Sequence, residues 1–223
     1  MKKRLLCTLA LLVGALALFS DCRKGPEQTG QTGLWQGEEL YFAQFGVPLE
    51  QALENLGIPQ DSLTEGDHGE LNLRQSWEID GMEFSQMLSV FAAGEDYDSQ
   101  GFDWKGFNHD ETVYRMDLTY VGKADGNTTA DQLLERGIAL AVQAKELYGA
   151  PTTYPGLEQR IFDEEGNLKG EKYSSYKEEW QVSEGVTMEL SIHQDDQGMM
   201  LRLTYMPDIV REYALFGRTR DVK

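Results

Sequence analysis

The chain has 223 residues, of which 20 are Lys or Arg and 38 are Asp or Glu, so its formal net charge is −18. Binding to nucleic-acid phosphates or directly to anionic lipid requires clustered basic residues, and this charge argues against both functions. Apolar residues make up 40% of the chain, which is enough for a hydrophobic core and argues against wholesale disorder.

The first residues are predicted to be a secretory signal peptide. Met1 to Arg4 is basic and is followed by an apolar run from Leu5 to Phe19. This run is too short to span a bilayer comfortably and has the usual length of the apolar part of a signal peptide. We therefore expect the protein to be exported.

The end of the signal resembles a bacterial lipobox, in which small residues precede a Cys that is lipidated and becomes the mature N-terminus. Ser20 and Cys22 fit this pattern, whereas Phe19 and Asp21 depart from it. The alternative is ordinary cleavage near residues 15–17, which match the small-x-small rule and would give a soluble secreted protein.

Two features favour lipidation at Cys22. The residues that follow, up to Gly33, are polar and Gly-containing, as expected for a flexible tether. The other cysteine, Cys7, lies within the signal, so the mature chain cannot form an intramolecular disulfide. We expect a lipoprotein on the extracytoplasmic side that contacts the membrane only through this anchor.

The mature chain divides into two regions with a similar order of elements. The full division is a signal peptide (1–21), a tether (22–33), a first α/β module (34–124), a second α/β module (125–206) and a C-terminal tail (207–223).

In the first module, residues 34–45 are typical of either a short helix or a lead-in strand. A helix is predicted over 48–56, because apolar residues recur at helical spacing and Gly57 and Pro59 then end it. Alternating apolar residues predict three strands, the first two joined by a turn at Asp80-Gly81. These strands are residues 71–79, 82–91 and 114–120.

In the second module, Thr129 and Gln132 form a capping box at the start of a helix predicted over 130–148. The helix ends at Gly149 and Pro151, the same Gly-x-Pro ending as in the first module. Alternation again predicts three strands. They are residues 173–182, 186–192 and 201–205.

The two modules share short matches in the same order, which indicates an internal duplication. The matches are LGIP with YGAP, SWEI with EWQV, LSV with LSI, and DLTYV with RLTYM. The predicted fold is therefore α+β, with two tandem modules that each pack a helix on an antiparallel sheet of three or four strands. Whether the two sheets join or pack side by side is left open.

A helix ending in L-G-x-P, followed by a Trp-bearing strand and an antiparallel meander, resembles the SmpA/OmlA outer-membrane lipoproteins, whose module occurs in tandem in the β-lactamase inhibitor protein. The residues that carry this resemblance are Leu56, Gly57, Pro59 and Trp77 in the first half and Tyr148, Gly149, Pro151 and Trp180 in the second. The resemblance implies binding or scaffolding rather than catalysis. The chain departs from it in offering one clear helix in its first half and in lacking the inhibitor's disulfides.

Residue types that bind metals are present but are not spaced as ligands, so no metal site or cofactor is predicted. The three histidines, His68, His109 and His193, have no regularly spaced partners, and neighbours in the run Asn108 to Glu111 point opposite ways on an extended chain. The acidic segments 163–171 and 195–198 lack the spaced oxygen ligands of a calcium loop and are read as hairpin turns.

No catalytic residues are predicted either. Glu178 and Glu179 are neighbours on a predicted strand, so they should lie on opposite faces rather than act as a pair. The sequence also has no Gly-rich phosphate loop and no nucleophile elbow.

One segment, residues 93–110, is an insertion relative to the second module. It places four aromatic residues among Gly and Asp: Tyr97, Phe102, Trp104 and Phe107. A long loop without periodicity is either functional or disordered, and four aromatic residues argue against disorder. These residues either fold back as a satellite cluster on the sheet or form an exposed loop that binds a partner.

The functional hypothesis is an exported, lipid-anchored, non-catalytic binding or envelope protein. The aromatic loop and the flanking sheet would contact a protein, peptide or glycan, with no nucleic acid involved. The alternatives are an exported hydrolase that acts on envelope or glycan substrates through unidentified acids, and a purely structural module whose aromatic loop is core.

Overall fold

The structure is a computed structural model in which the chain divides into two compact units, residues 1–32 and 33–223. All residues that it describes belong to the second unit. They are residues 33–35, 37–65, 70–121, 130–152, 175–195 and 198–220. The predicted signal peptide, Cys22 and the tether up to residue 32 lie outside them.

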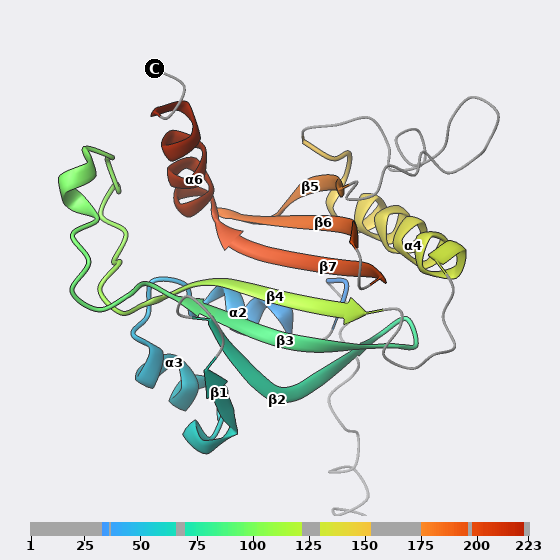
Figure 1. Cartoon of the computed structure of the whole chain (residues 1–223), viewed down its shortest axis with the longest axis horizontal. Coiled ribbons are helices and arrows are strands. Elements are labelled where there is room, and N and C mark those ends of the chain that lie inside the picture. Colours follow the sequence, from blue (N-terminus) through green and yellow to red (C-terminus); the bar gives the residue numbers. More distant parts are fainter. Residues whose placement is uncertain are drawn as a thin grey trace, which may run out of the picture. The chain divides into compact units, whose positions relative to one another are not determined.

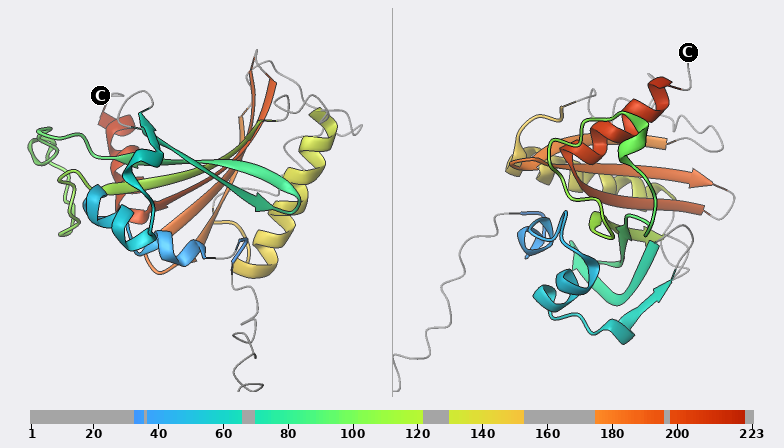
Figure 2. Two further views of the ribbon diagram at one scale, coloured as in Figure 1. Left: turned by 90° about the horizontal axis from the view of Figure 1, so that it is seen from below. Right: turned by 90° about the vertical axis from the view of Figure 1, so that its left-hand side faces the viewer.

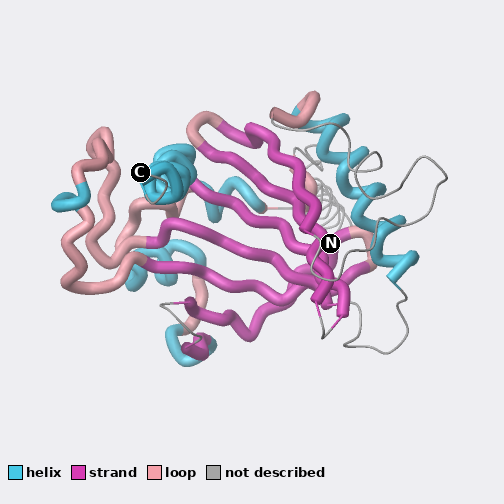
Figure 3. The backbone as a smooth tube through the Cα atoms, turned by 45° about the horizontal axis from the view of Figure 1, so that its top comes forward, coloured by secondary structure: helices cyan, strands magenta, loops and turns pink. Residues whose placement is uncertain are grey.

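The described residues form an α+β structure around one antiparallel sheet, which confirms the predicted class (Figures 1 and 3). The strand order is β1-β2-β3-β4-β7-β6-β5. The strands are β1 (Leu63–Glu65), β2 (Glu70–Ile79), β3 (Met82–Val90), β4 (Val113–Val121), β5 (Ser175–Ser183), β6 (Val186–Asp195) and β7 (Gly198–Pro207). The helices are α2 (Glu38–Phe42), α3 (Leu49–Leu56), α4 (Ala130–Tyr148) and α6 (Asp208–Arg220), with 3₁₀ turns η2 (Gln60–Ser62) and η4 (Asp98–Gln100).

The predicted C-terminal ends of the two predicted helices, α3 and α4, are confirmed. Helix α3 ends at Gly57, whose φ of 66° is left-handed, and Ile58 then donates a 2.9 Å backbone hydrogen bond to the carbonyl of Leu53. Helix α4 ends at Gly149, with φ of 88°. Glycine takes this conformation without the steric cost that a Cβ atom brings, and the proline two residues later prevents continuation of the helix.

All six predicted strands are present within a few residues of their expected bounds. The turn between β2 and β3 is formed by Asp80 and Gly81, both with positive φ, as a type I′ hairpin requires. The segment 34–45, for which a helix and a strand were both considered, contains the short helix α2. The short edge strand β1 was not predicted.

The strands from the two halves of the chain belong to one sheet, which answers the question that the sequence left open. Strands β4 and β7 pair at the middle of the sheet, where Leu118 lies opposite Leu203. On either side, Asp117 lies opposite Thr204 and Thr119 opposite Arg202. The last strand of each half is therefore the partner of the other.

The main core lies on one side of this sheet, where α4 packs on β5, β6 and β7 (Figure 2). Gly137 allows this close approach, because a Cβ atom there would come within 2.6 Å of the Ile192 side chain. On the side of α4 that faces the sheet, Leu133 and Leu140 are fully buried, whereas Val142 is 48% exposed. A period of 3.6 residues places these two leucines on the stripe that contains Gly137.

Residues assigned to the C-terminal tail form the helix α6, which packs against β6 and β7. In Figure 1 it stands beside the insertion between β3 and β4, at the end of the sheet away from α4. This placement brings together two segments about 100 residues apart in the chain, and it builds the candidate site.

Candidate functional site

The aromatic insertion folds against α6 and forms a second hydrophobic cluster, separate from the main core. Phe91, Trp104 and Val210 are its buried members, and each is 5–6% exposed. The other three aromatic residues of the insertion are half-buried and pack around them: Tyr97, Phe102 and Phe107. We refer to these residues, with Tyr114, Ile209 and Tyr213, as the aromatic cluster.

Ring contacts hold the insertion on α6. The ring centroids of Trp104 and Tyr213 are 4.6 Å apart, and those of Phe102 and Tyr213 are 5.4 Å apart. Trp104 also meets Phe91 edge to face at 5.6 Å. Because the Trp104 ring is enclosed by these neighbours, the structure supports a satellite cluster rather than an exposed loop at this residue.

The backbone of the insertion turns sharply between Trp104 and Phe107. The N–H of Phe107 donates to the carbonyl of Trp104 at 2.9 Å, and the two residues between them, Lys105 and Gly106, both have positive φ. The turn carries Lys105 to the surface, where its Nζ lies 2.7 Å from Glu212 of α6. Polar ties thus reinforce the ring contacts.

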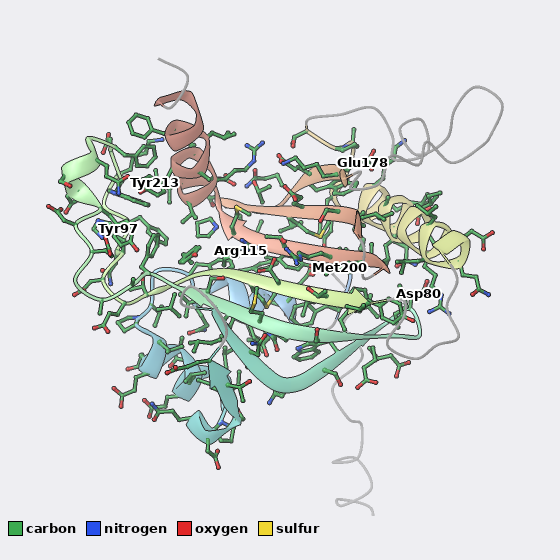
Figure 4. All side chains as sticks on the ribbon, in the orientation of Figure 1. Asp80, Tyr97, Arg115, Glu178, Met200 and Tyr213 are labelled. Carbon is green, nitrogen blue, oxygen red and sulfur yellow. The ribbon has the colours of Figure 1, made fainter. Side chains whose placement is uncertain are left out.

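Figure 4 labels Tyr97 and Tyr213 on the two segments that meet here. The Tyr213 hydroxyl donates to the Gln100 side-chain oxygen at 2.5 Å. His109 packs its ring 4.9 Å from that of Trp104, and its Nε2 lies 3.2 Å from Asp98. His109 is therefore part of the cluster's packing, and no group of three or more potential metal ligands occurs in the part of the chain that the structure describes.

A pocket of about 380 Å³ opens where the insertion, α6 and the β5–β6 turn meet. Its lining residues are Phe45, Lys105, Phe107, Gly185, Val186, Pro207, Asp208, Ile209 and Glu212. Apolar side chains dominate this set, with one cation and two carboxylates among them. Phe107 is thus the one predicted partner-binding residue that lines the pocket.

Both carboxylates of the pocket already have partners. Asp208 accepts a 2.6 Å hydrogen bond from the Thr187 hydroxyl and a 3.0 Å hydrogen bond from the Gln181 amide. Glu212 is paired with Lys105. The pocket therefore offers apolar contact area with a charged edge, which suits an apolar side chain of a partner better than acid–base chemistry.

Next to the pocket, the face of the sheet opposite the main core carries polar side chains. Arg115 pairs with Asp117 at 2.7 Å, and Lys177 lies 2.9 Å from Glu189. Lys177 also lies 3.5 Å from Glu179, which pairs with Arg211 of α6. We call this surface the polar face.

Glu178 and Glu179 point to opposite sides of β5, as predicted. Glu178 lies opposite Leu190 on the core side, and Glu179 lies opposite Glu189 on the polar face. Both are buried, at 3% and 4% exposure. They cannot act together on one substrate.

Glu38 is an unusual charge within the main core, because its side chain is only 3% exposed. Its carboxylate accepts hydrogen bonds from the hydroxyls of Tyr148 and Tyr205, the latter at 3.3 Å. Burial raises the pKa of Glu38 to about 6, although these two hydrogen bonds act in the opposite direction. Gly33 leaves room for this side chain, since a Cβ atom there would collide with it. The arrangement fixes the start of the domain to α4 and β7.

Several predictions concern residues outside the described part of the chain. These are the lipidation site Cys22, His68, the side chain of His193, the acidic segment 163–171 and most of the 195–198 turn. Of the helices that are described, none combines the length and the apolar character needed to cross a membrane.

Comparisons with models of protein families, with curated proteins and with solved structures find no match for this chain. The likeness to the SmpA/OmlA lipoproteins therefore stays a prediction from short motifs.

Proposed function

We propose that this chain is an exported, non-catalytic binding protein of the cell envelope, anchored by lipid at Cys22. Its binding site is the pocket formed by the insertion, α6 and the β5–β6 turn, with the neighbouring sheet surface. The partner is a protein or peptide that inserts an apolar side chain between Phe107 and Ile209. The observation that carries this proposal is that the insertion and α6 together line an apolar pocket.

A peptide suits the pocket better than a glycan does. Sugars bind proteins largely by stacking on open aromatic faces, and the Trp104 ring is 5% exposed. A peptide instead offers an apolar side chain for the pocket and backbone or charged groups for its edge, where Lys105 and Glu212 lie. The hydrolase alternative finds no support here, since Asp208 and Glu212 are both engaged.

The experiment is a pull-down from the native envelope with the mature chain as bait, followed by affinity measurements with the partner that it recovers. We expect Phe107→Ala to weaken binding at least tenfold, because it removes one of the two aromatic side chains that line the pocket. Phe102→Ala is the matched control: it lies in the same insertion but does not line the pocket. Equal loss in both variants would show that the insertion acts only through its fold.

Anchoring is tested separately. We expect the wild-type chain to incorporate a fatty-acid label and to fractionate with membranes. Cys22→Ser should abolish the label and release the protein, while the affinity for the partner stays unchanged. A Cys22→Ser variant that still carries the label would contradict the lipobox.

We also propose that the two halves are duplicated modules that form a single sheet. Support comes from the register, because each half places its Trp in the same relation to the central pair Leu118 and Leu203. Trp77 lies opposite Phe84, two residues before the partner of Leu118, and Trp180 lies opposite Met188, two residues before the partner of Leu203. In this alignment the LSV and LSI match shifts by two residues, while the DLTYV and RLTYM match is kept.

A further inference from the structure

We propose that the polar face holds a second binding site, for a carboxylate, centred on Arg202. Arg202 lies on β7, at the middle of the sheet. In register on its two sides are Thr119 of β4 and Ser191 of β6. Lys177 of β5 lies next in the same row, opposite Ser191. Cross-strand neighbours on one face are about 5 Å apart, so these side chains form a contiguous row of donors.

Arg202 differs from the other cations of this face in having no acidic partner among the residues that the structure describes. Within the described part of the chain, a terminal nitrogen of Arg202 donates to the Met200 sulfur at 3.2 Å, and its Nε is buried without an acceptor. By contrast, Arg115, Lys177 and Arg211 each contact a carboxylate. A thioether is a weak acceptor, so most of the hydrogen-bonding capacity of this guanidinium is free.

The two hydroxyls beside Arg202 are also available. Neither the Thr119 nor the Ser191 side chain makes a hydrogen bond within the described residues, although Ser191 is only 9% exposed. A planar guanidinium flanked by two hydroxyl donors matches an oxyanion, which is acceptor-only. Water or a donor ligand would leave this set of donors less completely satisfied.

Charge selects a single carboxylate over a more highly charged anion. Among the described residues of this face and α6, the cations Arg115, Lys177 and Arg211 are paired with Asp117, Glu179 or Glu189, whereas Arg202 has no carboxylate partner. Glu78 and Glu83 add negative charge to the same face on the side of β2 and β3, and the whole chain carries −18. The next row along the strands contains Asp117 and Glu189 at about 7 Å, which would repel a phosphate dianion. The planar carboxylate also fits the two parallel donors of an arginine.

The row is reached from the side of the sheet opposite α4. Figure 4 labels Arg115 and Met200 over the middle strands of this side, and no described helix crosses them. The site is separate from the pocket, because Pro207 at the pocket lies five residues along β7 from Arg202, or about 17 Å. Its existence does not depend on the proposed function.

The test measures binding of a hexaglutamate peptide to the mature chain at low ionic strength by calorimetry and by amide chemical shifts. A chain of this net charge should repel such a peptide everywhere except at a local cationic site. We expect saturable binding that weakens with salt, and Arg202→Gln should weaken it at least tenfold. Arg202→Lys keeps the positive charge but loses the two parallel donors of the guanidinium. Its affinity for the peptide should therefore lie between those of the wild type and Arg202→Gln.

Lys145→Gln is the matched control, since it removes the same charge from α4 on the other side of the sheet, and it should change the affinity less than twofold. Shift changes in the wild-type chain should centre on Thr119, Ser191 and Arg202, which tests the location even if a variant unfolds. Absence of binding, shifts elsewhere, or equal losses in Arg202→Gln and Lys145→Gln would each overturn the proposal. Competition by inorganic phosphate at lower concentration than acetate would overturn the choice of carboxylate.

Discussion

The molecule has two hydrophobic cores built on different principles. The main core joins the sheet to α2, α3 and α4, and its central residues, such as Leu118 and Leu203, are fully buried between aligned elements. The aromatic cluster joins an irregular insertion to the C-terminal helix, and most of its rings are half-buried. The main core is continuous with the backbone ladder of the sheet, whereas the contacts described between the insertion and α6 are made by side chains.

This difference indicates where the protein can open. Regions with few buried apolar contacts and few backbone hydrogen bonds have the lowest free energy of local unfolding. We therefore expect amide exchange in residues 93–110 and in α6 to be faster than in β4 and β7. The pocket lies at the edge of the less stable region, where a partner can be accommodated by small movements.

The largest effect is expected from Trp180→Ala in the main core. The Trp180 side chain is 1% exposed, and its indole N–H donates to the carbonyl of Gly149 at 3.1 Å. Removing it leaves a cavity and an unpaired carbonyl, so the free energy of unfolding should fall by about 3–5 kcal/mol. Urea unfolding followed by circular dichroism measures this loss. A loss below 1 kcal/mol would contradict a tightly packed main core.

Trp104→Ala should cost less, about 2 kcal/mol, because its half-buried neighbours can collapse into the space. Substituting each of these two tryptophans by Phe tests the difference between the main core and the aromatic cluster further. Trp104→Phe should stay within about 1 kcal/mol of wild type, since it removes a buried indole N–H that has no partner. Trp180→Phe loses a hydrogen bond and should lower the free energy of unfolding more than Trp104→Phe does. Similar losses of unfolding free energy in the two Phe variants would contradict this difference between the main core and the aromatic cluster.

The stability of the main core should depend on pH through the buried Glu38, which lies within it. Its folded pKa of about 6 lies above its ordinary value of 4.5, so the folded chain holds the proton more tightly than the unfolded chain. The contribution of Glu38 to stability is therefore favourable at low pH and is lost as pH rises from 4.5 through 6, by about 2 kcal/mol.

Glu38→Gln stays neutral and should lack this loss. We expect the variant to gain stability relative to wild type between pH 4.5 and pH 7, as measured by urea unfolding at both values. A constant difference between the two proteins across this range would show that burial does not perturb the Glu38 carboxyl.

The smallest effect is expected at the edge of the aromatic cluster. Lys105 and Glu212 form a salt bridge at 2.7 Å, but both side chains are at least half exposed. Such pairs contribute little because water and salt screen them. Lys105→Gln should leave the urea midpoint unchanged at 150 mM salt. A marked shift would mean that the ion pair, rather than the rings, holds the insertion on α6.

Local signals in the sequence determined most of the elements, although not the short strand β1 or the helix α6. Gly57 and Gly149 end the two predicted helices because left-handed backbone favours glycine, and Asp80-Gly81 specifies a tight hairpin turn. Period-two alternation located the six principal strands and separated Glu178 from Glu179. These features depend on neighbouring residues, so they could be read without knowledge of the fold.

The tertiary structure alone decided how distant segments meet. The pairing of Leu118 with Leu203 merges the two halves into one sheet, and no local pattern specifies that partner. Likewise, Trp104 is buried because α6 places Tyr213 and Val210 over it, and the pocket exists only where these segments join. The composition of the insertion predicted that its four aromatic residues would either form a satellite cluster on the sheet or bind a partner. Contacts across about 100 residues determined that Trp104 became core, while Phe107 came to line the pocket.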